Sequence, residues 1–336
     1  MAVPVHQHLS ISHRFFYHDW SLRESKPHLI VASREGEVTE ITHDFETNFW
    51  QTDTGLLSAI SVSKDGSLLA SSSSCGIDVI QLADKTLERR FPDPYENAAI
   101  SFSNCADRFW IARREEKKFL IEVFDRQSWK RLASTEIEDP FCGSSASFYK
   151  LPEMSQPSYE QTLWLAAGQN GIQLIFLRYV DHEIQFHPPL SDVSPVSVSP
   201  SLNAFCVAGG SRFRQFGYPD LTQTGECVWP DDNTVDDSVG YYSNYIDETK
   251  AILKTQELRI LKADMRTMEV TGDLLLDRED EPQHSALDAG RSYYADLSYF
   301  FKFGSSIVTA NRRHDEQRKT KYSLTFYRIE DILADW

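Results

Sequence analysis

The stretch ISVSKDGSLLASSSSCGIDVIQL, residues 60–82, alternates apolar and polar side chains in three short runs. A turn at Lys64-Asp65-Gly66 separates the first two runs, and Cys75-Gly76 separates the second run from the third. Alternation with a period of two is typical of β-strands that bury one face. The stretch therefore predicts three consecutive antiparallel strands, and the fold depends on whether the rest of the chain repeats them.

The pattern recurs about 40 residues later, where Ala99–Ser103 matches Ala59–Ser63 and Phe109–Ala112 matches Leu68–Ser71. Further runs that resemble the second strand give a series near residues 30, 69, 110, 165, 206, 252 and 308. Third strands are expected at Glu37–Thr42, Ile77–Leu82, Leu120–Phe124, Gln173–Leu177, Arg212–Phe216, Leu258–Leu261 and Tyr322–Tyr327. Spacings of roughly 40 to 55 residues are typical of propeller blades, whose small sheets bury their faces against each other.

Residues 57–91 resemble a blade of the WD-repeat family. Ser63-Lys64-Asp65-Gly66 stands where that family has a Ser-Pro-Asp-Gly turn, and Phe124-Asp125 stands where it has its Trp-Asp dipeptide. No third strand ends in Trp-Asp, and no Gly-His precedes a first strand, so the chain resembles a divergent member. The expected fold is all-β: one domain over residues 1–336, a seven-bladed β-propeller of four-stranded antiparallel blades. An N-terminal strand within residues 5–12 is expected to complete the last blade and close the ring, which removes an exposed edge.

Composition narrows the functional classes. The formal net charge of −16 disfavours nucleic-acid binding through bulk charge, because an acidic body repels phosphate. The first 30 residues contain no apolar run of signal-peptide length, and no window of the chain suits a membrane span. The five cysteines are odd in number and form no Cys-x-x-Cys, which predicts reduced thiols and an intracellular setting, cytoplasm or nucleus.

Motifs for catalysis are weak. His6-Gln7-His8 places two imidazoles on one strand face, but no Cys, Asp or Glu flanks them, so a solvated edge strand is expected. Ala208-Gly209-Gly210-Ser211 lacks the Lys of a phosphate-binding loop and predicts a tight turn. The chain is therefore expected to be no enzyme, with no catalytic residue, cofactor or metal. Two alternatives stay open: a lactonase-like propeller enzyme with an axial metal, and an RNA-associated propeller that uses the basic loop at residues 311–321.

The acids between blades are the most informative functional signal. In a WD-type blade, the connections from one blade to the next lie on one rim, and each of these connections here carries an acid, with aromatic residues among them. Acids beside exposed aromatics suit a basic ligand through charge pairing and cation–π contacts. The resemblance implies a protein–protein interaction scaffold, and the rim predicts intracellular partner proteins with a basic peptide or helix. The expected partner-binding residues are Asp93, Tyr95, Glu96, Glu138, Asp139, Phe141, Trp229, Asp231, Asp232, Asp236, Asp237, Asp280 and Glu281.

Overall fold

The computed structural model describes the chain except residues 1–2, 14–16, 24–25, 104–107, 117, 139–145, 150–161, 168–172, 187–189, 192–196, 200–203, 210–211, 218–221, 229–241, 255–259, 275, 277–299, 315–319 and 335. The described residues form antiparallel strands in a β-propeller arrangement, with a short C-terminal helix, α1 (Ile329–Ala334). The predicted all-β class is therefore confirmed. The chain divides into two compact units, residues 15–194 and residues 1–14 with 195–336.

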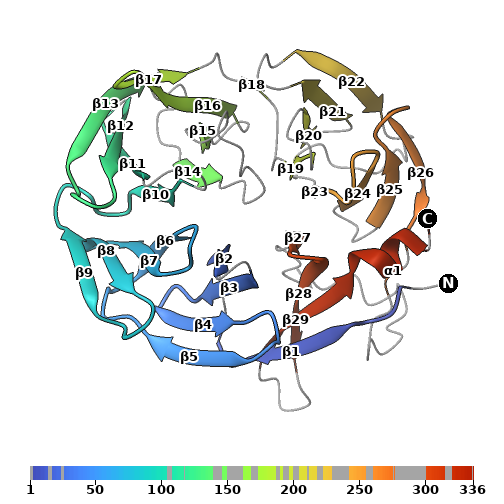
Figure 1. Cartoon of the computed structure of the whole chain (residues 1–336), viewed down its shortest axis with the longest axis horizontal. Coiled ribbons are helices and arrows are strands. Elements are labelled where there is room, and N and C mark those ends of the chain that lie inside the picture. The colour runs from blue at the N-terminus through green and yellow to red at the C-terminus, as the bar shows by residue number, and fades with distance from the viewer. Residues whose placement is uncertain are drawn as a thin grey trace. The chain divides into compact units, whose positions relative to one another are not determined.

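The unit of residues 15–194 holds sheets 1 to 4, numbered along the chain. Sheet 1 consists of β2 (Tyr17–Arg23), β3 (Lys26–Ala32), β4 (Glu37–Ile41) and β5 (Thr47–Gln51), and sheet 2 of β6 (Leu57–Val62), β7 (Leu68–Ser73), β8 (Gly76–Gln81) and β9 (Leu87–Phe91). Sheet 3 consists of β10 (Ala99–Phe102), β11 (Arg108–Glu115), β12 (Lys118–Asp125) and β13 (Arg131–Glu138). The first strands of consecutive sheets, β2, β6, β10 and β14, contact one another (Figure 1).

Sheet 4 departs from the predicted pattern. It consists of β14 (Ala146–Tyr149), β15 (Thr162–Ala167), β16 (Gln173–Val180) and β17 (Glu183–Phe186), and β18 (Leu190–Ser191) pairs with β16 as a fifth strand. The sequence between β17 and β18 contains Pro188-Pro189, and proline has no N–H to give to a ladder. β17 and β18 both pair with β16, at Leu177–Val180 and at Gln173–Leu174. Six four-stranded blades are present among the described residues, and the prediction of seven such blades is wrong.

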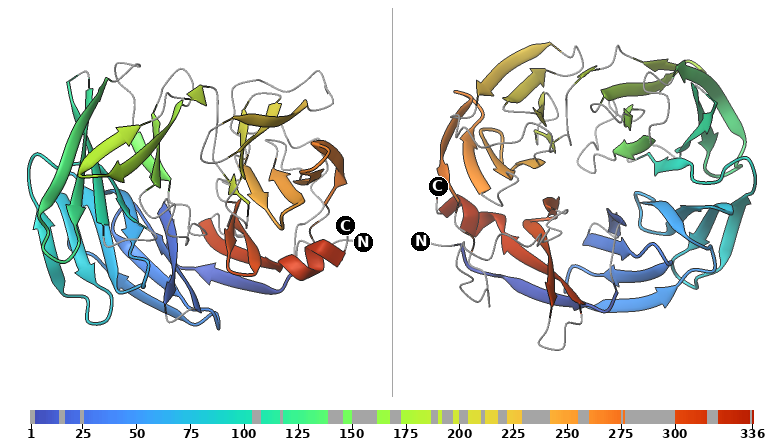
Figure 2. Two further views of the ribbon diagram at one scale, coloured as in Figure 1. Left: turned by 45° about the horizontal axis from the view of Figure 1, so that its top comes forward. Right: turned by 180° about the vertical axis from the view of Figure 1, so that it is seen from behind.

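The other unit holds sheets 5 to 7. Sheet 5 consists of β19 (Ser197–Val198), β20 (Ala204–Gly209), β21 (Arg212–Gly217) and β22 (Gln223–Val228), and sheet 6 of β23 (Tyr242–Tyr245), β24 (Lys250–Lys254), β25 (Ile260–Asp264) and β26 (Glu269–Asp273). Sheet 7 contains β27 (Phe300–Phe303), β28 (Ser306–His314), β29 (Thr320–Arg328) and, from the N-terminus, β1 (Gln7–Ile11). As predicted, the N-terminal strand completes the last sheet, in register from Gln7↔Phe326 to Ile11↔Tyr322 (Figure 2). Closure of a ring by this strand stays a prediction.

The core lies between neighbouring sheets, as period-two strands that hide a face require. Leu68, Val79 and Phe91 of sheet 2 pack with Phe102 and Phe109 of sheet 3, and all five are buried. Every residue of β7, the second strand of sheet 2, is buried. The predicted second-strand centres all fall inside observed strands, so the repeat inferred from the sequence is the repeat of the fold.

Several predicted connections lie partly or wholly outside the described residues. Gly209 pairs with Arg212, and the two residues between them, where a tight turn was expected, lie outside the described residues. In the basic segment 311–321, residues 311–314 and 320–321 are strand, because the β28–β29 ladder continues to His314↔Thr320, and residues 315–319 lie outside the described residues. A projecting loop expected at residues 151–161 lies outside the described residues. In the described part of the chain, no helix has the length and apolarity needed to cross a membrane.

Candidate partner-binding rim

Within the unit of residues 15–194, the candidate site lies at the end of the sheets where the chain passes from one sheet to the next. This connector rim comprises residues 34–36, 52–56, 74–75 and 92–98 together with Glu138. The hairpins bind the connectors through main-chain hydrogen bonds: Leu57 N–H donates to Arg34 at 2.7 Å, and Asn97 N–H donates to Ser73 at 2.7 Å. The rim is therefore a fixed part of the fold.

Gly76 shows why the sequence builds the rim this way. Its φ of +111° lies in the region that side chains rarely adopt, and a Cβ at this position would stand 2.2 Å from the carbonyl oxygen of Phe91. Only glycine lets the β7–β8 hairpin turn this closely over the end of β9. The connector that leaves β9 is consequently held against the hairpin, and it carries Asp93, Tyr95 and Glu96.

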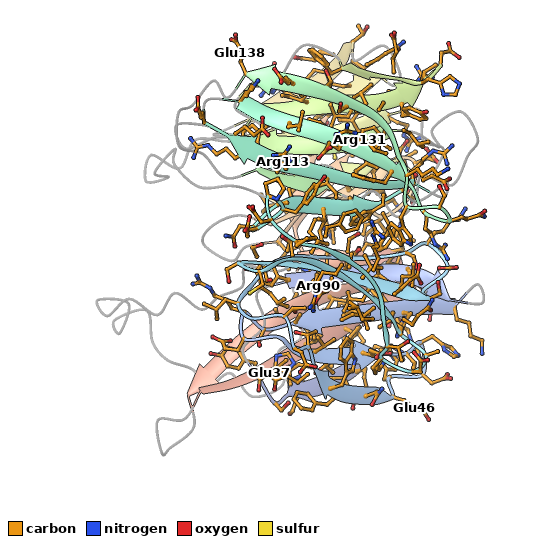
Figure 3. All side chains as sticks on the ribbon, turned by 90° about the vertical axis from the view of Figure 1, so that its left-hand side faces the viewer. Glu37, Glu46, Arg90, Arg113, Arg131 and Glu138 are labelled. Atoms are coloured by element: carbon orange, nitrogen blue, oxygen red, sulfur yellow. The ribbon has the colours of Figure 1, made fainter. Side chains whose placement is uncertain are left out.

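The structure places four of the predicted partner-binding residues. Asp93, Glu96 and Glu138 are exposed, and Tyr95 is half-buried beside them in the chain. Glu138 ends β13 at the same end of the unit as Glu37, whereas Glu46 lies at the opposite end (Figure 3). The other nine predicted residues lie outside the described residues, namely Asp139, Phe141, Trp229, Asp231, Asp232, Asp236, Asp237, Asp280 and Glu281.

Tyr95 is held in place by its neighbours. Its ring packs edge-on against Phe91, with the centroids 5.6 Å apart, and the Arg113 guanidinium lies 5.5 Å from the ring centroid. Burial raises the pKa of Tyr95, and the charge of Glu122 together with a hydrogen bond to it raises this pKa further. The tyrosine therefore stays neutral at physiological pH and presents a fixed aromatic edge at the rim.

The buried acid Glu122 binds Arg113, whose guanidinium lies beside the Tyr95 ring. Glu122 is 0% exposed, and its carboxylate accepts hydrogen bonds from Arg131 Nη1 at 2.8 Å and Arg113 Nε at 3.3 Å. Arg113 also contacts Glu115. An acid buried at this depth requires such partners, because an unpaired buried charge is strongly destabilising. This network was not predicted from the sequence, although Glu122 interrupts the apolar run Leu120-Ile121…Val123-Phe124, a pattern that indicates a buried acid.

The acids at the two ends of the unit have different roles. Asp65, Asp84 and Asp125 lie on the turns opposite the connector rim, and each accepts hydrogen bonds from its own turn: from Ser67 N–H at 3.1 Å, Thr86 N–H at 3.1 Å and Ser128 N–H at 2.8 Å. By contrast, no hydrogen bond or ion pair joins the side chain of Asp53, Asp93, Glu96 or Glu138 to another residue in the described part of the chain. Their charge is available to a ligand.

Leu56 adds an apolar element to the connector rim. It is 50% exposed, next to the buried Leu57. The sequence analysis did not select Leu56, but adjacent leucines at a strand entrance imply that one of them faces outward, because successive side chains point to opposite faces. A solvated Leu56 near Asp53 can contact the apolar part of a basic side chain or segment.

The remaining candidates from the sequence are a metal site, the histidines near the N-terminus and the cysteines. Among the described residues, no group of three or more His, Cys, Asp or Glu side chains is arranged to hold a metal ion. His8, on the outer strand of sheet 7, is exposed, and its Nδ1 lies 3.1 Å from Thr325 Oγ1. Cys75, Cys206 and Cys227 are free thiols, and Cys206 is buried, whereas Cys105 and Cys142 lie outside the described residues.

Comparisons with known proteins found no protein-family model and no curated protein that matches this chain.

Proposed function

We propose that the protein is a non-enzymatic interaction scaffold, in which the connector rim docks a basic segment of a partner protein. In this proposal sheet 4 counts as a blade with a split outer strand, so that seven blades close into a ring through β1, as in WD-repeat proteins. The observation that carries the proposal is the contrast between the two ends of the unit of residues 15–194. At one end Asp65, Asp84 and Asp125 cap turns, and at the other end acids whose side chains bond no described residue lie on the same rim as Tyr95 and Leu56.

Electrostatics explains what such a rim does. Unpaired carboxylates on one surface attract a basic partner and accelerate its encounter, and this attraction weakens as the Debye length falls from about 10 Å at 0.1 M salt to about 3 Å at 1 M. Tyr95 and Leu56 supply contacts that hold the partner after encounter. The expected partner is an intracellular protein whose basic segment also carries an apolar side chain.

The WD-repeat resemblance is supported by turn chemistry. Ser63 Oγ donates to Asp65 at 2.6 Å, and Arg126 Nη1 of sheet 3 reaches the same carboxylate at 3.3 Å. Asp125 accepts a hydrogen bond from Ser128 Oγ at 2.6 Å, so the residue that replaces the Asp of Trp-Asp caps its own turn. These contacts support a blade of the WD-repeat kind in sheets 2 and 3.

The test compares proteins captured from a cell extract by the native chain and by a rim variant with Asp53→Asn, Asp93→Asn, Glu96→Gln and Glu138→Gln. A matched control carries Asp44→Asn and Glu46→Gln, which remove exposed acids from the opposite end. A partner retained by the native chain and the control but lost by the rim variant supports the proposal. With that partner purified, the rim variant should reduce the association rate more than the dissociation rate. A partner that the rim variant retains at native strength contradicts the proposal.

The two alternatives are tested separately. Metal analysis of the purified protein tests an axial metal enzyme, because a resident ion at one equivalent contradicts a scaffold without cofactors. The length of the β28–β29 ladder is the observation that favours RNA contact. The ladder continues through Arg312 and Arg313, beyond the residues of β28 that pair with β27. RNA retention that falls steeply with salt and is lost in an Arg312→Ala, Arg313→Ala variant would support that alternative.

A further inference from the structure

Outer strands of a sheet expose main-chain groups that can pair with another chain. Most outer strands of this protein have a feature that hinders such pairing, namely a register shift, charged side chains or a nearby proline. In the unit of residues 15–194, the outer strands β9 and β13 are each paired with an irregular register. The pairing of β9 with β8 shifts between Val79 and Ile80 of β8, and the pairing of β13 with β12 shifts between Val123 and Phe124 of β12. Both strands are also charged, Leu-Glu-Arg-Arg-Phe in β9 and Arg-Leu-Ala-Ser-Thr-Glu-Ile-Glu in β13. In sheet 4 two short strands, β17 and β18, pair with β16, and the sequence between them contains Pro188-Pro189.

β5 has none of these protections. Its sequence, Thr-Asn-Phe-Trp-Gln, contains no charged residue and no proline, and it pairs with β4 in an unbroken register from Glu37↔Gln51 to Ile41↔Thr47. Phe49 is 53% exposed at its centre. Among the described outer strands of this unit, β5 is the one that combines an unbroken register and an uncharged sequence with an exposed apolar side chain at its middle, which are the properties of an edge open to pairing.

The register shows which main-chain groups face outward. Thr42 N–H bonds the Glu46 carbonyl at 3.0 Å, and Thr52 N–H bonds the Gly36 carbonyl at 2.9 Å. In an antiparallel ladder these bonded pairs alternate with pairs whose N–H and C=O groups point away from the neighbouring strand. Asn48 and Trp50 therefore bond β4, whereas Thr47, Phe49 and Gln51 direct their main-chain groups to the open edge.

The strand β5 is also anchored by the side chain of Trp50. The Trp50 ring is half-buried against sheet 2, and the Lys85 ammonium lies 4.8 Å from its centroid. Lys85 in turn contacts the buried Glu40 on β4, the strand that pairs with β5. A strand fixed in this way loses little conformational freedom when another strand joins it, which favours binding.

Charge selects the kind of partner. Exposed acids flank the neutral strand at both ends: Asp44 and Glu46 before it, and Asp53 after it. Glu37, on the neighbouring β4, lies at the opposite end of sheet 1 from Glu46 (Figure 3). An extended segment with an apolar centre and basic ends complements this pattern. A second copy of the chain does not, because antiparallel self-pairing centred on Phe49 brings Glu46 of each copy next to Asp53 of the other.

We propose that β5 is a strand-addition site, at which an extended basic segment of a partner protein joins sheet 1 as a further strand along Thr47–Gln51. Main-chain hydrogen bonds to Thr47, Phe49 and Gln51 supply the affinity, and Phe49 contacts an apolar side chain at the centre of the segment. The site shares Asp53 with the connector rim, but its main-chain groups lie on β5, outside the rim.

The probe is the synthetic peptide acetyl-Lys-Arg-Val-Thr-Val-Thr-Val-Lys-Arg-amide, added to the full chain. At 100 times its Kd, it should slow hydrogen exchange of the Thr47 and Gln51 amides by about 100-fold, because exchange then requires dissociation. N-methylation of those peptide residues whose N–H groups pair with β5 should abolish binding, and N-methylation of the alternate residues should not. Equal loss with both methylated peptides contradicts a main-chain ladder.

Protein variants separate this site from the rim. Phe49→Lys places a cation at the centre of the edge, and Thr47→Pro removes an outward N–H without removing a bond to β4; each should weaken peptide binding at least tenfold. Leu87→Lys is the matched control, since Leu87 is 50% exposed on the protected outer strand β9 and its variant should bind as the native chain does. A rim variant that keeps Asp53 (Asp93→Asn, Glu96→Gln, Glu138→Gln) should also bind normally. Peptide binding that survives both β5 variants, or that this three-residue rim variant loses, overturns the proposal.

Discussion

Oδ2 of Asp19 on β2 accepts a hydrogen bond from the main-chain N–H of Val62 on β6 at 2.6 Å, and so joins sheet 1 to sheet 2. Ser61 repeats the contact one sheet further, where its Oγ accepts from Phe102 N–H at 2.9 Å. Ser61 Oγ also donates to Asp19 Oδ2 at 3.3 Å. One chain of hydrogen bonds thus ties the first strands of three sheets, and all of these residues are buried.

Replacing Asp19 with Ala should lower the free energy of unfolding by about 1–3 kcal/mol, because the buried N–H of Val62 then has lost its acceptor. Urea denaturation followed by circular dichroism measures the loss. Asp19→Asn is the matched control, because it keeps a side-chain oxygen at the same distance along the side chain, and it should cost less. Equal losses for the two variants would show that the charge of Asp19, rather than its acceptor, matters here.

Two glycines on the connector rim test the close packing of the hairpins. Gly76→Ala should destabilise the protein by about 3 kcal/mol or more, because the new Cβ would meet the Phe91 carbonyl at 2.2 Å in a backbone conformation that alanine already disfavours. Gly55→Ala is the control, since φ is also positive there but the nearest atom, Cys75 Sγ, is 3.6 Å away. It should cost about 1 kcal/mol. The melting temperatures of the two variants should fall in that order, and the reverse order contradicts the packing argument.

Acid should weaken the turn at Ser63–Ser67. Burial disfavours the charged form of Asp65, but hydrogen bonds from Ser63 and Ser67 and the charge of Arg126 outweigh it and lower its pKa from 3.8 to about 2. A carboxyl whose pKa is lower in the folded state stabilises the fold above its unfolded pKa, and the contribution disappears as the pH falls from about 4 to about 2. Asp65→Asn should therefore flatten the fall of melting temperature across this range relative to the native chain. Parallel curves would contradict the lowered pKa.

The cysteines should differ in reactivity in the native state. Cys75 is exposed at the β7–β8 hairpin, whereas Cys206 and Cys227 are buried, and burial raises the pKa of the Cys227 thiol. A maleimide reagent should label Cys75 quickly and should label Cys206 and Cys227 only after unfolding. Peptide mapping by mass spectrometry without reductant gives the result. Rapid native labelling of Cys206, or a disulfide that involves Cys75, would contradict the structure.

The period-two pattern was sufficient to predict most of the fold. Each predicted second strand lies in an observed strand, because a run that hides one face must alternate whatever its neighbours are. The pairing of β1 with β29 was also predictable, since three C-terminal strands without an outer partner leave an edge that the unassigned N-terminal strand can cover. Both inferences rest on local sequence and on the need to bury edges.

Features that depend on spatial partners were not predictable in the same way. Nothing in the sequence near Glu122 names Arg113 and Arg131 as its partners, although the apolar run around it indicates that it is buried. Pro188-Pro189 was visible as a strand breaker, but its effect, two short strands on one edge of β16, depends on register. The unbroken register of β5 likewise becomes informative only beside the shifted registers of β9 and β13.

Deleting residues 1–12 should lower the melting temperature clearly. The deletion removes β1, which pairs with β29 over five residues, and it removes the buried side chains of Val3 and Ile11. It also exposes the outer edge of β29, a strand that then can pair with other chains, so light scattering should rise on heating. His8→Ala is the control, because it removes one exposed contact to Thr325 and should change the melting temperature little. An unchanged melting temperature after the deletion would contradict a structural role for β1 and, with it, the proposed closure of the ring.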